Sequence, residues 1–138
     1  MAVYLANTGV LTVNAVDLSS LVSNVVINRS FDELEVSSLG DSGHRFVKGL
    51  EASSITIDFF NDPESAKTLQ TLNSSSVWGN NVTVTFKQKD AVISASNPLY
   101  TMTCLVNNTT PVNGAVGDLS TQSVTWNVSG TIDVDTTP

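Results

Sequence analysis

Apolar and polar residues alternate with a period of two along most of this chain, which restricts its fold more than any other feature. Successive side chains of a β-strand point to opposite faces, so this pattern predicts strands with one buried face. The same alternation, rich in β-branched residues, predicts further strands at 22–28, 82–86, 99–106 and 123–129. The clearest segment is 53–60, which alternates Ile55, Ile57 and Phe59 with Ser54, Thr56 and Asp58.

One segment departs from the alternation and predicts a helix. Asp62 is a good N-cap residue, and Pro63 suits the first helical position. These features predict a short α-helix over about residues 63–72, and a helix of this length has to pack on a sheet to be stable. Apolar residues recur after Pro63 at helical spacing, at Ala66, Leu69 and Leu72.

The length of 138 residues suits a single domain with one core, and 41 % apolar residues are enough to fill it. The economical fold class is mainly β, a β-sandwich or partial barrel with one short helix packed on it. Two connections are long, at residues 37–50 and 107–119. Loops of such length inside a compact domain are usually functional or disordered.

The 37–50 segment combines three glycines with apolar side chains at positions that are expected to be exposed to solvent. The apolar residues either tuck under the loop or anchor a neighbouring subunit, and the sequence leaves both readings open. The glycines and the uncovered apolar groups predict a loop that becomes ordered only when a partner arrives. The apolar residues concerned are Leu39, Phe46, Val47 and Leu50.

The charge pattern argues against stable, sequence-independent binding of nucleic acid. The net charge is −7, and charged residues form only 14 % of the chain, against roughly 25 % in soluble domains. Stable nucleic-acid binding requires clustered Lys and Arg, whereas the six basic residues here are scattered. A surface with few charges and many short polar side chains favours an assembly protein over a free monomer.

The sequence contains no convincing set of catalytic or metal-ligating residues, and we expect a protein that is not an enzyme and needs no cofactor or metal. His44 is the single histidine, and Asp41 and Ser42 are too close to it in sequence to form a triad. Cys104 is the single cysteine, so an intrachain disulfide is impossible, and a buried structural thiol is expected. The acids at 32, 33 and 35 lack the glycine and distal glutamate of an EF-hand.

Membrane segments and a leader are not expected either. No stretch approaches the roughly 20 apolar residues that span a bilayer. Residues 1–5 lack the basic segment and long apolar run of a signal peptide. The expectation is a protein made and kept in the cytosol of the producing cell.

The order of several motifs resembles the tail tube (major tail) proteins of long-tailed bacteriophages. Many tube proteins have a similar "E-V-[ST]-x-x-G-D…G-L" loop, then an alternating strand, then an "N/D-P" helix start, and the last strands are similar too. The stretches that carry the resemblance are Leu34-Glu-Val-Ser-Ser-Leu-Gly-Asp-Ser-Gly-His-Arg-Phe-Val-Lys-Gly-Leu50, Ile55-Thr-Ile-Asp-Phe-Phe, Asn61-Asp-Pro-Glu and Thr121-Gln-Ser-Val-Thr-Trp-Asn-Val-Ser-Gly-Thr-Ile-Asp-Val.

The resemblance implies a structural virion protein. Six copies would join edges into a ring, rings would stack into the tail tube, and DNA would pass through a channel lined by the inner sheet. The loop at 37–50 would govern stacking between rings. The implied partners of the protein are other copies of the chain, the tape measure protein, the tail terminator and the tail tip proteins, with no membrane contact. Its implied location is the tail of the virion, after synthesis in the host cytoplasm.

Two groups of residues become site candidates through this resemblance. A negatively charged channel wall would repel phosphate and let DNA pass without sticking. The candidate stacking residues are Leu39, Gly40, Asp41, His44, Arg45, Phe46 and Val47. The candidate channel-facing residues are Ser54, Thr56 and Asp58, with Asp32, Glu33 and Glu35 near the rim.

Two other functions fit the same composition. A capsid decoration or head–tail connector protein would share the size and the oligomeric habit, and the long loop before the Ile55 strand favours the tube only in part. A carbohydrate-binding β-sandwich usually presents several exposed aromatic residues on one face. Most of the nine aromatic residues here are expected in the core, with Trp78 as the main exception.

Overall fold

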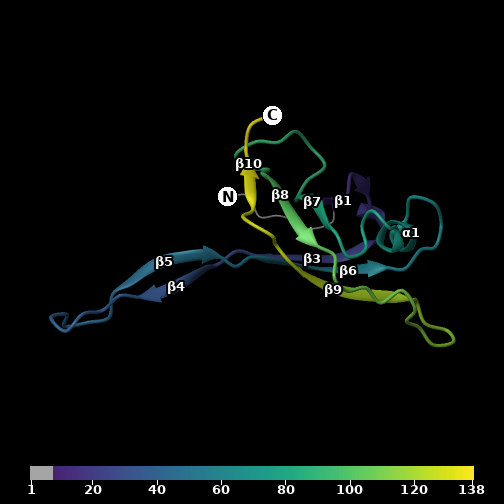
Figure 1. Cartoon of the computed structure of the whole chain (residues 1–138). Helices are drawn as coiled ribbons and strands as arrows, with labels where there is room; N and C mark the ends of the chain where they lie inside the picture. The colour runs from purple at the N-terminus through teal and green to yellow at the C-terminus, as the bar shows by residue number, and fades with distance from the viewer. Residues whose placement is uncertain (1–7) are drawn as a thin grey trace.

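The computed structural model describes residues 8–138; Met1–Asn7, and with them the expectation about a leader, lie outside the described residues. The first sheet has five antiparallel strands in the order β10-β8-β7-β1-β2. It forms the upper layer of the molecule in Figure 1. Its strands are β1 (Val10–Val13), β2 (Val16–Asp17), β7 (Asn81–Lys87), β8 (Leu99–Leu105) and β10 (Asp133–Asp135).

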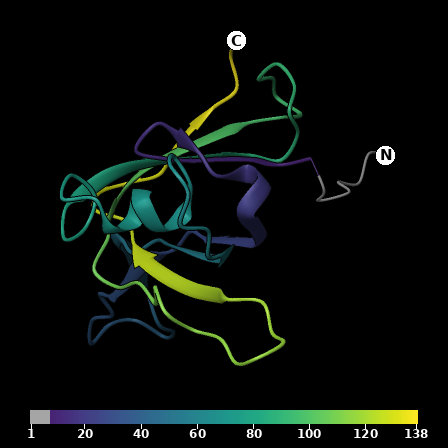
Figure 2. The same ribbon diagram turned by 90° about the vertical axis from the view of Figure 1, so that its right-hand side faces the viewer.

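A second, three-stranded antiparallel sheet forms the layer beneath it, with β6 between β3 and β9 (Figures 1 and 2). Its strands are β3 (Val22–Asn28), β6 (Ser54–Phe60) and β9 (Thr121–Asn127). Neither sheet closes into a barrel. The fold is therefore mainly β, with two sheets packed in a sandwich-like manner and one short helix, which confirms the predicted fold class.

The core lies between the two sheets, and it is built from the alternating residues that the sequence predicted to face inward. Ile55, Ile57 and Phe59 of β6 are completely buried. Trp126 of β9 packs beside Phe59, with ring centroids 6.3 Å apart, and its indole N–H donates to the carbonyl of Asn108 at 3.2 Å. The buried Cys104 of β8 lies in the same cluster.

The helix is shorter than predicted. α1 spans Thr68–Asn73, so its end agrees with the sequence pattern and its start does not. Ala66 has a φ of 59°, and an L-residue in this left-handed conformation interrupts a right-handed helix. Asp62 is not the N-cap; its carboxylate accepts the N–H of Glu64 at 3.0 Å and so stabilises a local turn. A 3-10 turn, η1 (Ser19–Leu21), precedes β3.

The predicted long loop at 37–50 is largely a β-hairpin, and this expectation was wrong in its bounds. β4 (Phe31–Glu35) pairs antiparallel with β5 (Phe46–Glu51), so only residues 36–45 connect strands. Residues 31–51, here called the arm, project away from both sheets (Figure 1, left). The connection between β8 and β9, residues 106–120, projects at the opposite end of the molecule and is called the β8–β9 loop.

A projecting arm and an opposing loop as candidate assembly surfaces

The arm is a direct continuation of the β3–β6 pair. Between the two pairs, the N–H of Ala52 donates to the carbonyl of Ser30 at 2.7 Å, and the Ser30 hydroxyl donates to the carbonyl of Ala52 at 2.7 Å. β9 covers the other side of β6 only as far as Asn127, which lies opposite Ser54. Beyond that point the sheet has two strands instead of three, and no other described element packs on the arm.

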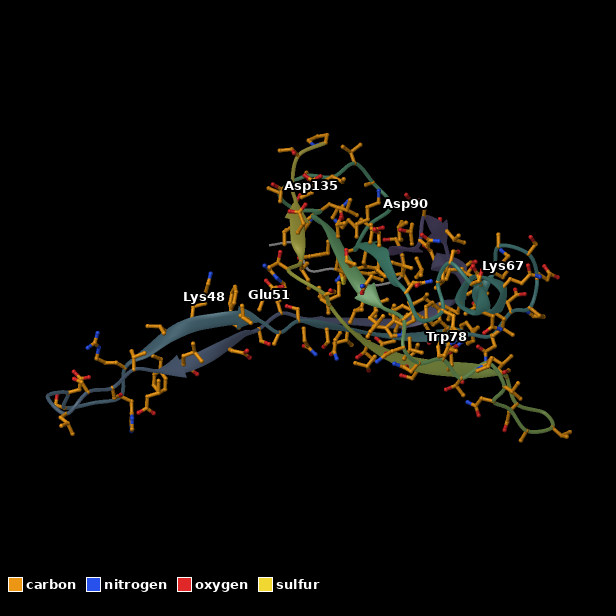
Figure 3. All side chains as sticks on the ribbon, viewed as in Figure 1. Lys48, Glu51, Lys67, Trp78, Asp90 and Asp135 are labelled. Atoms are coloured by element: carbon orange, nitrogen blue, oxygen red, sulfur yellow. The ribbon has the colours of Figure 1, made fainter. Side chains whose placement is uncertain are left out.

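Glu51 fixes the root of the arm to the body. Its carboxylate accepts the backbone N–H of Ile132 at 2.9 Å and the hydroxyl of Ser53 at 2.8 Å. These two hydrogen bonds, the first above all, lower the pKa of Glu51 below its usual value. The ionised Glu51 therefore holds the start of β6 against the segment that leads into β10 (Figure 3).

Each face of the arm carries apolar side chains. Leu34 and Val47 lie opposite each other in the pairing register. On the other face, the Lys48 ammonium lies 4.3 Å from the centre of the Phe31 ring. Phe46 is paired with Glu35 in the register. An isolated two-stranded hairpin with two wet faces is marginally stable at best in water.

A compact turn closes the arm at its tip. The N–H of Asp41 donates to the carbonyl of Ser38 at 3.1 Å, and the Asp41 carboxylate accepts the N–H of Ser38 at 2.7 Å. Leu39 is the second residue of this turn and is fully exposed. His44 contacts the Glu35 carboxylate at 3.1 Å, and Arg45 lies 3.7 Å from the Asp41 carboxylate. Short-range polar contacts thus fix the conformation of the tip and leave the side chain of Leu39 exposed to solvent.

Exposed apolar side chains are concentrated on the arm. Of the fourteen large hydrophobic residues that are exposed in the described part of the chain, seven lie on it. Single exposed apolar residues are ordinary on a protein surface, whereas seven on one short ribbon indicate an interaction surface or an aggregation hazard. The seven residues are Phe31, Leu34, Val36, Leu39, Phe46, Val47 and Leu50.

The residues that were predicted to govern stacking, at positions 39–41 and 44–47, also lie on the arm. The prediction that Trp78 is the main exposed aromatic residue needs a correction. Phe31 and Phe46 are as exposed as Trp78 and are not core residues. They sit on the arm, whereas Trp78 lies near the other end of the body (Figure 3). The exposed aromatic residues are thus not gathered on one face of the sandwich.

The candidate channel-facing residues separate into two places. Asp32, Glu33 and Glu35 lie on β4 in the arm and not on the three-stranded sheet. The other three, Ser54, Thr56 and Asp58, lie on the outer face of that sheet, because the residues between them are buried. The three acids of β4 were predicted to lie near the rim of the channel and not on its wall, and this remains a prediction.

The outer face of the three-stranded sheet is a nearly neutral polar surface without a cation. Nine of its residues form three cross-strand rows in the pairing register, and Phe60 and Thr121 form a further pair at one end. Asp58 is the single charge among these eleven residues, and Val26 and Phe60 are the apolar ones. Hydroxyl and amide groups bond across the strands, as between Thr56 and Thr125 at 3.0 Å. The rows are Asn28, Ser54, Asn127; Val26, Thr56, Thr125; and Asn24, Asp58, Ser123.

The outer edge of β3 is bordered by two adjoining hollows. They have volumes of about 210 and 240 Å³ and share Val25, Phe86 and Gln88 in their linings. β9 is different, because the side chains of Asn108 and Asn113 donate to its carbonyls at Thr125 and Thr121. β3 thus has the more open edge, where another strand could add to the sheet.

Other chemistry is sparse in the described residues. Residues 8–138 contain no cluster of three potential metal ligands among His, Cys, Asp and Glu. Burial raises the pKa of the Cys104 thiol to about 12, which leaves it protonated and unreactive at neutral pH. Across the same residues, none of the helical segments has the length and apolar character needed to cross a bilayer.

No protein-family model matches this chain, and no curated protein matches it significantly.

The β8–β9 loop is the element whose role sequence reasoning missed. It was recognised as a long connection, and its apolar residues received no role. The available signal was three aliphatic residues interspersed with turn-forming glycines, in a stretch with a single charged residue, Asp118. The three exposed residues are Val112, Val116 and Leu119.

Proposed function

We propose that this chain is a structural subunit that self-assembles into stacked rings, with hexamers as the expected ring, and so forms the tail tube of a bacteriophage. The arm is the observation that carries this proposal. Seven exposed apolar side chains on a two-stranded ribbon have no covering element among residues 8–138 of their own chain. Covering them by another copy removes that apolar surface from water, at about 25 cal/mol for each Å².

The nearly neutral outer face of the three-stranded sheet supports a role as channel wall. DNA that moves through a tube must not be held there, and strong retention requires Lys or Arg against the phosphates. The eleven residues of this face include neither. Their short hydroxyl and amide side chains keep such a wall wet without fixing an anion. Asp58 adds one negative charge per copy, which repels phosphate.

The open edge of β3 supports the joining of copies into a ring. A three-stranded sheet with unpaired backbone groups on one edge is prone to pair with another chain. Closure of several such sheets into one continuous barrel removes all free edges. It pairs β3 of one copy with β9 of the next, so Asn108 and Asn113 then give up their hydrogen bonds to the β9 carbonyls. The same arrangement places the three-stranded sheet on the inside and the five-stranded sheet on the outside.

Negative-stain electron microscopy of the purified protein, from dilute to concentrated, tests the proposal. We expect hollow tubes, or stacked rings with a channel wide enough for duplex DNA. The Leu39→Asp variant should remain folded and should form no stacks, because a charge replaces the exposed apolar residue at the tip of the arm. Val92→Asp is the matched control, since Val92 is 72 % exposed and lies outside the arm.

One result would contradict the tube, and another would contradict the role of the arm in stacking. Closed rings that never stack would favour a capsid decoration or head–tail connector protein. Normal tubes formed by Leu39→Asp would remove the arm from the stacking contact. The composition alone does not separate these functions, so the arm variant and the concentration series have to be examined together.

A further inference from the structure

We propose that the β8–β9 loop is the acceptor for the arm of a second copy of this chain. This inference rests on the proposed function and names the partner surface of the arm. The loop carries three strongly exposed aliphatic side chains, Val112, Val116 and Leu119. Together with the seven on the arm, these side chains make up ten of the fourteen exposed large hydrophobic residues of the described chain.

Buried amide groups hold the base of the loop in place. The side chain of Gln122, only 3 % exposed, accepts hydrogen bonds from the Thr109 hydroxyl and the Thr110 N–H, both at 2.8 Å. It also donates to the Asn61 side chain at 2.8 Å. Asn61 in turn donates to the Ser120 hydroxyl at 3.0 Å, so both ends of the loop are attached to one network. A fully satisfied polar network of this kind makes the attachment rigid.

The apex of the loop presents one aliphatic side chain in a fixed direction. The N–H of Asp118 donates to the carbonyl of Ala115 at 3.0 Å and closes a four-residue turn. Gly117 is the third residue of this turn, and its φ of 89° is the value that a type II turn requires there. Val116, the second residue, is fully exposed, as Leu39 is at the second position of the turn in the arm.

The positions of the two elements favour a second copy as the occupant. The arm and the β8–β9 loop lie at opposite ends of the molecule, beyond opposite ends of the three-stranded sheet (Figure 1). The arm leads away from the body, so it cannot reach the loop of its own chain. A donor at one end and an acceptor at the other make a head-to-tail contact, which repeats without limit and produces an open-ended stack.

Charge complementarity points the same way. The β8–β9 loop carries one charged residue, Asp118. The arm as a whole is acidic, with five carboxylates against Arg45 and Lys48, so the complementarity is confined to its tip. There the Arg45 side chain is 64 % exposed, whereas the Asp41 side chain is 20 % exposed and accepts the N–H of Ser38. A contact between the tip of the arm and the β8–β9 loop brings the exposed Arg45 near Asp118. Oppositely charged groups around an apolar centre fix the register of an interface and exclude wrong partners.

Two defective variants that restore each other provide the test. Leu39→Asp has a damaged arm and an intact loop, whereas Val116→Asp has a damaged loop and an intact arm. Each variant alone should form no stacks. When they are mixed, the intact arm of one should dock on the intact loop of the other and stop there. Light scattering should then show pairs of the unit that each variant forms alone, with a 1:1 composition.

The controls separate this inference from the proposed function. Val112→Asp should behave as Val116→Asp does, and Val92→Asp should stack as the wild type does. If the wild type stacks and Val116→Asp stacks equally well, the loop is not the acceptor, although the tube remains. If Val116→Asp fails to stack and the mixture contains no pairs, the loop binds something other than the arm. A wild type that never assembles overturns both proposals.

Discussion

The body and the arm are built from the same kind of sequence, and they differ in what happens to their apolar residues. In β6 the alternating residues Ile55, Ile57 and Phe59 are fully buried, because the five-stranded sheet covers that face. In β4 and β5, apolar residues are placed on both sides of a ribbon that no other part of the described chain covers. Alternation therefore specifies a strand, and it does not specify that the covering surface belongs to the same molecule.

The largest expected effect concerns the core of the body. Trp126 is completely buried, and Trp126→Ala should lower the free energy of unfolding by about 3–5 kcal/mol, through lost burial and the cavity that remains. Trp78→Ala is the matched control, because Trp78 is 47 % exposed and should cost less than about 1 kcal/mol. Urea unfolding followed by circular dichroism measures both. Equal losses would mean that the sandwich core does not dominate stability.

The fold of the body could be predicted because its signals are local and repeated. The alternating strands β3, β6, β7, β8 and β9 were predicted, whereas the short strands β1, β2 and β10 were not. The start of the helix was not predicted correctly, because Asn61-Asp-Pro-Glu contains no signal for the left-handed conformation of Ala66. A proline after a good capping residue suggested a helix there, and the chain uses these residues for a turn instead.

The candidate site was predictable only in part. The apolar residues at 39, 46, 47 and 50 were recognised as unusual, whereas their place on a projecting hairpin was not. Three glycines in the segment suggested a flexible loop, yet Gly49 lies inside β5. A Cβ at Gly49 would lie 2.9 Å from the carbonyl oxygen of Asp32, so glycine here permits close approach of the two strands. The register that demands this glycine is not visible in one sequence.

A smaller effect is expected at the base of the β8–β9 loop. Gln122→Leu removes the acceptor of the Thr110 N–H and one partner of Asn61, both in a part-buried setting. Such unsatisfied groups cost about 1–3 kcal/mol. Gln70→Leu is the control, since Gln70 is exposed and makes one hydrogen bond to the Pro63 carbonyl. If the two variants unfold at the same urea concentration, the amide network does not hold the loop.

The junction between body and arm should respond to acid. The pKa of Glu51 is lowered in the folded protein, first by the N–H of Ile132 and then by Ser53. A carboxylate with a lowered pKa contributes stability above its ordinary value of 4.5, and this contribution is lost as the pH falls through the folded pKa. The wild type should therefore be more stable than Glu51→Gln at neutral pH, and the difference should vanish well below pH 4.5. If the stability difference between the wild type and Glu51→Gln is independent of pH, it comes from the shape of the side chain and not from its charge.

The smallest free energy is expected for opening of the arm itself. Native-state hydrogen exchange in dilute protein should show opening of β4 and β5 at close to zero cost, because an uncovered two-stranded ribbon is marginal in water. The amides of β6 should exchange only through global unfolding. In assembled protein, the arm should become protected, and in Val116→Asp it should stay unprotected at the same concentration. Slow exchange across the arm of dilute monomers would mean that the ribbon is stable without a partner. The contrast between a self-covered body and a partner-covered arm would then fail.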